Sequence, residues 1–140
     1  MPRRLVLDTN VLVAGLRSRR EASYRILELV EAREVTPVLS VQLVLEYEAV
    51  LKRQTRLLGL TPEDVDRLLD DLCVLGERRL VYFLWRPTLR DPRDELVLEI
   101  AVAAGCPEIV THNVRDFAGS ERFGVEISTP RQWLTKIGES

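Results

Sequence analysis

An acidic residue interrupts an apolar stretch near the start of the chain. Asp8 lies between the apolar residues 5–7 and, after Thr9 and Asn10, the apolar residues 11–13. These flanks predict a buried strand that runs into the start of a buried helix. A buried carboxylate needs a partner, because an isolated charge is costly to remove from water. A metal cation is one candidate partner, and a helix cap made by Asp8, Thr9 or Asn10 is the alternative.

Strand and helix patterns alternate along the rest of the chain. We expect strands over residues 4–9, 35–40, 79–84, 107–111 and 125–127, and helices over residues 24–30, 41–54, 61–76, 91–104 and 129–137. Such alternation favours an α/β fold, a three-layer α/β/α sandwich with a mainly parallel central sheet. The 140 residues show no internal repeat or linker, so we expect a single domain over residues 1–140.

Several classes of protein are disfavoured by the composition. No apolar run approaches the roughly 20 residues that span a bilayer, and the first residues lack the features of a signal peptide. Cys73 and Cys106 are too few for a disulfide framework, and each lies in an apolar segment. We expect both to be reduced packing residues of a cytoplasmic protein with no membrane association.

Four acidic residues lie where the predicted parallel sheet brings separate chain segments together. Asp8 ends the first strand, Glu46 lies early in the helix after the second, and Asp94 lies in the first turn of the helix at residues 91–104. Asp116 follows the strand that ends at Thr111. All four positions point to the carboxyl edge of a parallel sheet, where ligands of such folds bind.

Each acid also has an ordinary structural interpretation. Asp8 can cap a helix, Asp116 can be a loop residue, and Glu46 can be a surface residue, although helical spacing predicts that it is half-buried. Asp94 can complement the helix dipole, an effect of about 0.3–1 kcal/mol. The helix at residues 91–104 is apolar nearly all round, so we expect Asp94 to face inward, and Glu95 and Glu99 outward.

Carboxylates that gather within a few ångströms repel one another unless cations lie among them. Mg²⁺ and Mn²⁺ prefer such oxygen ligands, and Mg²⁺ takes one or two carboxylates and keeps several waters. A bound ion can activate a water and neutralise charge on a phosphoryl oxygen. Four polar residues stand where they can support the carboxylates by hydrogen bonding: Thr9, Asn10, Ser40 and Thr111.

The cations of the chain are mostly arginines. The formal net charge is −2, so the chain without the four acids carries +2. Arginine binds phosphate well because its planar group can donate two parallel hydrogen bonds. One cluster (Arg17, Arg19 and Arg20) follows the Asp8 segment, and another (Arg86, Arg90 and Arg93) precedes Asp94. The candidates for RNA contact are Arg17, Arg19, Arg20 and Arg93, and a solvated arginine-rich surface is the alternative.

Other chemistries find little support. No Cys and His set matches a zinc site, no glycine-rich phosphate loop is present, and no nucleophile elbow supports Ser/His/Asp catalysis. The single histidine, His112, adjoins the acidic positions, although one histidine is more often a packed or solvated residue. An aspartyl-phosphatase of the haloacid dehalogenase type needs an acid two residues after its nucleophile, where this chain has Asn10.

Taken in order, the motifs resemble those of the PIN-domain ribonucleases over essentially the whole chain. The matching segments are residues 7–12, 39–46, 91–94, 110–117 and 128–134. The likeness is greatest to the small single-domain branch that serves as toxins of prokaryotic toxin–antitoxin pairs. By motif, Asp8, Glu46 and Asp94 match the main acidic metal ligands of that family. Many members carry an acid where this chain has Asn113, so the resemblance implies Asp116 as the substitute, with Asn113 as a neutral ligand or a supporting group that orients the acids.

The resemblance implies a PIN-like fold and an endoribonuclease that uses one or two Mg²⁺ or Mn²⁺ ions. Metal-activated water would hydrolyse single-stranded RNA and leave a 3′ hydroxyl and a 5′ phosphate. It also implies a cognate antitoxin protein and a possible homodimer. Tyr82, Phe83 and Trp85 can face either the core or such a partner. Because Asn113 replaces an acid, a PIN fold that binds RNA or protein without cutting is the alternative.

Overall fold

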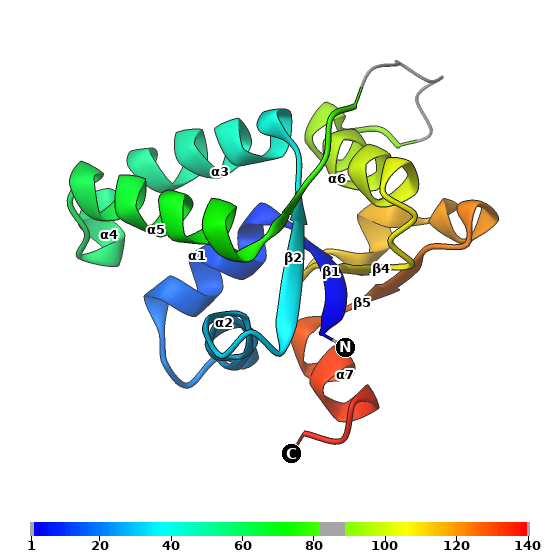
Figure 1. Cartoon of the computed structure of the whole chain (residues 1–140), viewed down its shortest axis with the longest axis horizontal. Helices are drawn as coiled ribbons and strands as arrows, with labels where there is room; N and C mark the ends of the chain where they lie inside the picture. The colour runs from blue at the N-terminus through cyan, green and yellow to red at the C-terminus, as the bar shows by residue number, and fades with distance from the viewer. Residues whose placement is uncertain (1, 82–88, 140) are drawn as a thin grey trace.

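A computed structural model describes residues 2–81 and 89–139 of the chain, and its centre is one five-stranded sheet. All strand pairs are parallel, in the order β3-β2-β1-β4-β5. The strands are β1 (Arg3–Leu7), β2 (Val35–Leu39), β3 (Glu77–Arg78), β4 (Glu108–Val110) and β5 (Glu126–Ser128). Strand β1 is central, with β2 on one side and β4 on the other (Figure 1).

Helices flank this sheet, as the alternating pattern predicts. Figure 1 shows α1, α2 and α5 on one side of the sheet and α6 on the other. The helices are α1 (Thr9–Arg17), α2 (Ala22–Glu31), α3 (Val41–Arg53), α4 (Thr55–Leu58), α5 (Pro62–Leu75), α6 (Pro92–Ala103) and α7 (Pro130–Lys136). Two short 3₁₀ helices, η1 (Val114–Phe117) and η2 (Ser120–Phe123), connect β4 to β5. The predicted α/β fold is confirmed.

Polar side chains cap the starts of α1, α3, α5, α6 and α7, and three of these caps directly follow a strand. Asp8 caps α1 after β1, Ser40 caps α3 after β2, and Thr129 caps α7 after β5. A capping side chain accepts a hydrogen bond from an otherwise unpaired N–H of the first helical turn. Strand β1 therefore ends at Leu7, because Asp8 already belongs to the start of α1. The caps place a row of polar groups along the carboxyl edge of the sheet.

The core lies on both faces of β1 and under α6. Leu5, Val6 and Leu7 are all fully buried, which is expected for the central strand of a parallel sheet covered on both faces. On α6, Val97 and Leu98 are equally buried. The prediction that this helix is largely buried is therefore confirmed.

The third strand lies earlier in the chain than the sequence pattern predicts. The structure forms β3 at Glu77–Arg78, and residues 79–81 are not a strand. Gly76 allows this, because a Cβ there would lie 2.7 Å from the carbonyl oxygen of Pro37 in β2. The close approach lets the chain join the sheet directly after α5. The rest of the predicted strand, residues 82–84, lies outside the described residues, as do Phe83, Trp85 and Arg86.

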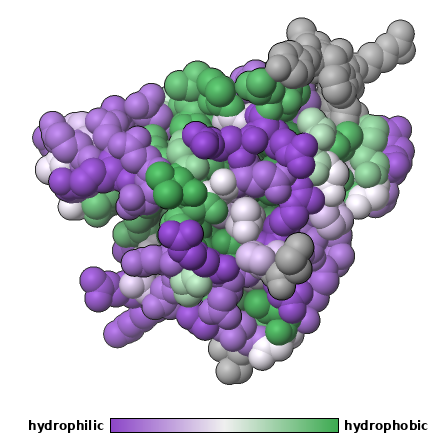
Figure 2. Space-filling view, viewed as in Figure 1, coloured by the Kyte–Doolittle hydropathy of each residue, from purple (hydrophilic) through white to green (hydrophobic). Residues whose placement is uncertain are grey.

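The apolar spacing of residues 41–54 predicts that Val41, Val44, Leu45, Val50 and Leu51 point mostly inward, and this is wrong for Val41 and Leu45. Val41 and Leu45 are 61% and 56% exposed. Leu51 is buried as predicted, and Val44 and Val50 are half-buried. The other buried residues are Leu43 and Tyr47, which recur with Leu51 every four residues and so share one helix face. Figure 2 shows the resulting apolar surface (green) over the start of α3. Because α3 packs against both α5 and α6, these two helices decide which of its apolar positions are covered.

Cys73 is half-buried, Cys106 is buried, and both are free thiols.

Within residues 2–81 and 89–139, no helix combines the length and the apolar character that crossing a bilayer requires.

Candidate active site

The sheet has a natural binding position where its strand order reverses. From β1 the chain builds outward to β2 and β3, then returns to the other side of β1 to add β4 and β5. Connections after β1 and β4 therefore leave in opposite directions, and a crevice opens at the carboxyl ends of these two strands. A cavity of about 500 Å³ lies there. Its lining includes six acidic residues: Asp8, Glu21, Glu46, Asp91, Asp94 and Asp116.

Asp8 lies at the base of this cavity and is held by hydrogen bonds from two segments. Its backbone N–H donates to the carbonyl oxygen of Val110 at 2.9 Å, which fixes it against the end of β4. The carboxylate oxygen Oδ1 accepts from the N–H of Thr9 at 2.8 Å, and Oδ2 accepts from the hydroxyl of Thr111 at 2.7 Å. Asp8 is 9% exposed, so this carboxylate has a fixed orientation.

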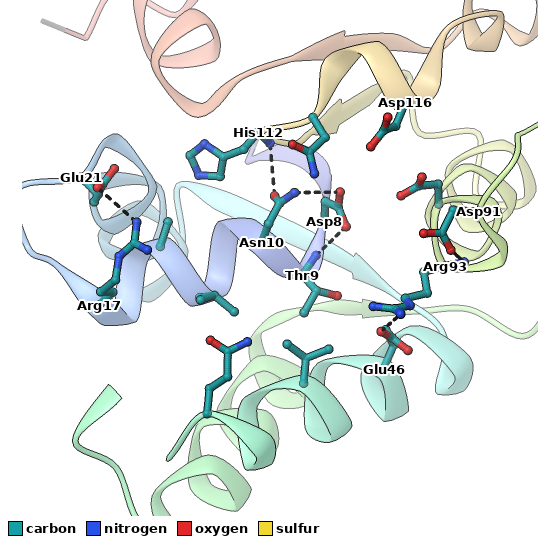
Figure 3. Close-up of a pocket in the computed structure, with 16 residues that line it drawn as sticks. Asp8, Thr9, Asn10, Arg17, Glu21, Glu46, Asp91, Arg93, His112 and Asp116 are labelled. Carbon is teal, nitrogen blue, oxygen red and sulfur yellow. Dashed lines mark hydrogen bonds and ion pairs between the residues drawn. The ribbon is translucent and has the colours of Figure 1, made fainter. Parts of the chain in front are cut away.

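A small amide and hydroxyl network surrounds the carboxylate. The side-chain NH₂ of Asn10 lies 3.3 Å from Oδ2 of Asp8 and 3.4 Å from Oγ1 of Thr111. Oγ1 of Thr111 also accepts from the N–H of Asn113 at 3.0 Å. Oδ1 of Asn10 accepts from the N–H of His112 at 3.2 Å (Figure 3). Thr9, Asn10 and Thr111, which were predicted to support the acids, thus contact Asp8 directly.

Two carboxylates of the cavity bind protons more tightly than ordinary aspartates. Burial raises the pKa of Asp8, and the hydrogen bonds from Thr111 and Thr9 partly offset this. For Asp94, burial and then the charges of Asp8, Asp91 and Asp116 raise the pKa to about 6. Both shifts come first from burial and second from nearby like charges, an environment that favours a cation.

Glu46 approaches the cavity from the opposite wall. It is half-buried on α3, as its helical spacing predicts, with its side chain 20% exposed. Its Oε1 lies 4.0 Å from Nε of Arg93 at the start of α6, and Figure 3 shows the two side chains meeting across the cavity. Ser40, another predicted supporting residue, accepts from the N–H of Leu43 at 3.1 Å. It therefore sets the start of α3 and contacts none of the acids directly.

The fourth acidic position comes from the segment after β4. Asp116 lies in η1, and both it and Asn113 are exposed and line the cavity. The charge of Asp116 contributes to the raised pKa of both Asp8 and Asp94. Asp116 therefore shares the electrostatic environment of the buried Asp8 and the half-buried Asp94. On α6, Glu95 and Glu99 do not line the cavity, although both are half-buried.

The four predicted acids line one cavity but do not already form a metal cage. Within residues 2–81 and 89–139, no three Asp, Glu, His or Cys side chains are close enough to hold one ion as they stand. Coordination would need side-chain rotation by Glu46, Asp94 or Asp116, whereas Asp8 is held in place.

The basic residues separate into two groups. Arg17, at the end of α1, and Arg93 line the cavity. Arg19 and Arg20 lie in the exposed turn after α1 and do not line it. Of the predicted candidates for RNA contact, Arg17 and Arg93 are thus the two that reach the cavity.

The sequence pattern did not indicate two acids of the cavity lining, Asp91 and Glu21, or Tyr47, which bonds to the strand end beside Asp8. Asp91 caps α6 through the N–H of Arg93 at 2.9 Å, lines the cavity, and adds to the raised pKa of Asp8 and Asp94. Glu21 pairs with Arg17 at 3.7 Å on the cavity wall. Tyr47, fully buried, donates to the carbonyl oxygen of Leu7 at 2.5 Å. The Asp-Pro pair was a visible signal for Asp91, but it also marks an ordinary helix start.

Comparison with known proteins agrees with this geometry. No curated protein matches the chain significantly. A family model described as PIN domain matches residues 4–115, which includes Asp8, Glu46, Asp94 and Asn113 and ends just before Asp116. PIN domains are a family of nucleases, generally metal-dependent, which suggests a nucleic acid substrate. Because the match covers most of the sequence, the chain belongs to the PIN domain family.

Proposed function

We propose that the protein is an endoribonuclease that hydrolyses phosphodiester bonds of single-stranded RNA with the help of Mg²⁺ or Mn²⁺. The observation that carries this proposal is the convergence of Asp8, Glu46, Asp94 and Asp116 on one cavity. They come from four separate segments of a chain that belongs to a nuclease family.

The residues of the cavity fit a hard divalent cation. Asp8, Glu46, Asp94 and Asp116 supply carboxylate oxygens, and Asn113 can add an amide oxygen. Oxygen-rich sets of this kind suit Mg²⁺ and Mn²⁺ rather than zinc. Burial, and then the charges of Asp8, Asp91 and Asp116, raise the pKa of Asp94 to about 6, and the charge of Arg93 offsets only part of this. One or two divalent ions would supply the missing positive charge.

The residues of the chain have distinct roles in this proposal. Asp8 is the fixed ligand, because Thr9 and Thr111 hold both of its oxygens. Glu46, Asp94 and Asp116 are adjustable ligands that complete the site. A bound Mg²⁺ or Mn²⁺ would contribute charge neutralisation at a phosphoryl oxygen and a lowered pKa for the attacking water.

Substrate binding must overcome the negative charge of the cavity. Arg17 and Arg93 are the two arginines of its lining, and each can donate paired hydrogen bonds to a phosphate. A single strand suits the cavity better than a duplex, because its backbone can bend toward recessed carboxylates. Water attack in line with the leaving 3′ oxygen would yield a 3′ hydroxyl and a 5′ phosphate.

Cleavage of a mixed pool of single-stranded RNA by the purified protein tests the proposal. We expect Mg²⁺- or Mn²⁺-dependent cutting with 5′-phosphate ends, and loss of cutting in Asp8→Asn and Asp94→Asn with the fold intact by circular dichroism. Asp70→Asn, which changes an exposed acid on α5, is the matched control. Equal cleavage by the Asp8 variant and the control would overturn the proposal. Metal and RNA binding without any cleavage would instead support a non-catalytic PIN fold.

We further propose that this activity serves as the toxin of a toxin–antitoxin pair. The support is the resemblance of the ordered motifs, from residues 7–12 to residues 128–134, to the small toxin branch of the family. Induced expression should arrest growth, and co-expression of an adjacent antitoxin gene should restore it. Growth arrest that persists in the Asp8→Asn variant would contradict a toxin role based on cleavage.

Light scattering of the purified protein tests the homodimer that the resemblance implies.

A further inference from the structure

His112 occupies a distinctive place beside the carboxylates. It follows Thr111 at the end of β4, is exposed, and lines the cavity. Figure 3 shows it on the side of Asn10 that faces Arg17, whereas Asp91 and Asp116 lie on the other side. The imidazole therefore borders the part of the cavity away from the densest negative charge.

The ring is anchored although the residue is exposed. Nε2 of His112 and Oγ of Ser23 are 3.0 Å apart and hydrogen-bonded. Ser23, in the first turn of α2, is fully buried, so its hydroxyl is a fixed partner. A solvated surface histidine would have no such constraint. Ser23 thus holds the imidazole in one position at the rim of the cavity.

The backbone of His112 is tied to the same network as Asp8. Its N–H donates to Oδ1 of Asn10 at 3.2 Å, and the NH₂ group of Asn10 lies 3.3 Å from Oδ2 of Asp8. The imidazole is therefore held at a constant position relative to Asp8 by contacts at both its ring and its backbone. Within the described part of the chain, Nδ1 has no hydrogen-bonding partner.

We propose that His112 is a base-contacting residue of the nucleic acid site, and that Ser23 is the residue that positions it. This inference rests on the proposed function, because it requires a nucleic acid strand in the cavity. An anchored imidazole offers an aromatic face for stacking and a free ring nitrogen for a base edge. Stacking on aromatic side chains is a common way for proteins to bind unpaired bases.

The geometry also separates two kinds of contact. The carboxylates and Arg93 surround the position of the reacting phosphate, whereas His112 contacts a base of a neighbouring nucleotide. Loss of the imidazole should therefore weaken binding of the strand and alter the preference for bases near the cut. It should change the KM for short RNA more than kcat.

The test is a double-mutant cycle between His112 and the bases of a fluorescein-labelled single-stranded RNA. Binding is followed by fluorescence anisotropy in Ca²⁺ and again in EDTA. One base at a time is removed to leave an abasic site. We expect one abasic position to weaken binding by about tenfold in the wild-type protein and to have little effect in His112→Ala. His112→Phe should retain part of that difference through stacking.

Ser23→Ala gives a second, independent variant. It should reduce the same base-dependent difference while binding of the abasic strand and the melting temperature stay unchanged. If every abasic position affects wild-type and His112→Ala protein equally, or if no strand binds in either condition, the inference is overturned. An abasic position that weakens binding in the wild type but not in His112→Ala, without any RNA cleavage, would support the base contact and reject the nuclease assignment. RNA cleavage without such a difference between the two proteins would support the nuclease assignment and reject the base contact.

Discussion

The hydroxyl of Thr111 donates a 2.7 Å hydrogen bond to Oδ2 of Asp8, which joins the carboxyl ends of β4 and β1. These residues are 103 positions apart in sequence, and both are buried. The contact explains how a carboxylate in an apolar segment can be tolerated, because hydrogen bonds to an ionised group offset part of its cost of burial.

Thr111→Val should destabilise the protein by about 1–3 kcal/mol, because it removes the hydroxyl that donates to a buried carboxylate. Oδ2 of Asp8 loses its shortest hydrogen bond, and the N–H of Asn113 loses its acceptor. Urea unfolding measures the change, and Thr111→Ser, which keeps the hydroxyl, is the control. Equal stability of the Val variant and the wild type would show that this hydrogen bond contributes nothing.

The titration of Asp94 should make the metal-free protein less stable as pH rises. Its pKa is about 6 in the folded state against an ordinary value of 3.8, so the native state binds the proton more tightly than the unfolded state. The stabilisation is fully present below the unfolded pKa and is lost as pH rises through about 6.

Asp94→Asn removes this charge, so the variant should exceed the wild type in stability above pH 6, by about 1 kcal/mol after solvent screening. The advantage should disappear near the unfolded pKa. Thermal melts in EDTA across this pH range check the prediction. A stability difference between Asp94→Asn and the wild type that is the same at the lowest and the highest pH would contradict the assigned pKa.

Arg93→Ala should weaken RNA binding and make it less sensitive to salt. Each phosphate contact to a single strand contributes about 0.7 to the slope of log K against log salt concentration. We expect that slope to fall by about this amount in the variant. Arg3→Ala is the control, because Arg3 is exposed at the opposite end of β1. Matching slopes for the two variants would argue against a phosphate contact by Arg93.

The sequence was sufficient to predict the fold and the placement of the acids because both follow from strong, simple patterns. The apolar run around Asp8 requires a buried strand, and parallel strands bring their carboxyl ends to one edge. Ser40 and Thr129 are recognisable caps directly after strands, so the start of each helix could be predicted closely.

The features that were missed depend on tertiary packing. The exposed face of α3 at Val41 and Leu45 is decided by where α5 and α6 pack, which helical periodicity alone does not specify. The position of β3 depends on the close approach of Gly76 to Pro37. Asp91 looks like a local cap, and its contribution to the cavity is apparent once α6 is placed beside β1 and β4. The anchor between Ser23 and His112 joins residues 89 positions apart and has no local signal.

The most direct test of the account is a calorimetric titration of the metal-free protein with Mn²⁺, performed on the wild type, Asp8→Asn and Asp70→Asn. If the carboxylates of the cavity act together as a divalent-cation site, the wild type and the Asp70 variant should bind one or two ions with the same affinity. Binding by the Asp8 variant should be abolished or weakened at least about tenfold, because loss of even an outer-shell partner of a metal ligand costs about 10–100-fold and Asp8 is a direct ligand. Equal Mn²⁺ binding by all three proteins, or no binding by the wild type, would contradict it.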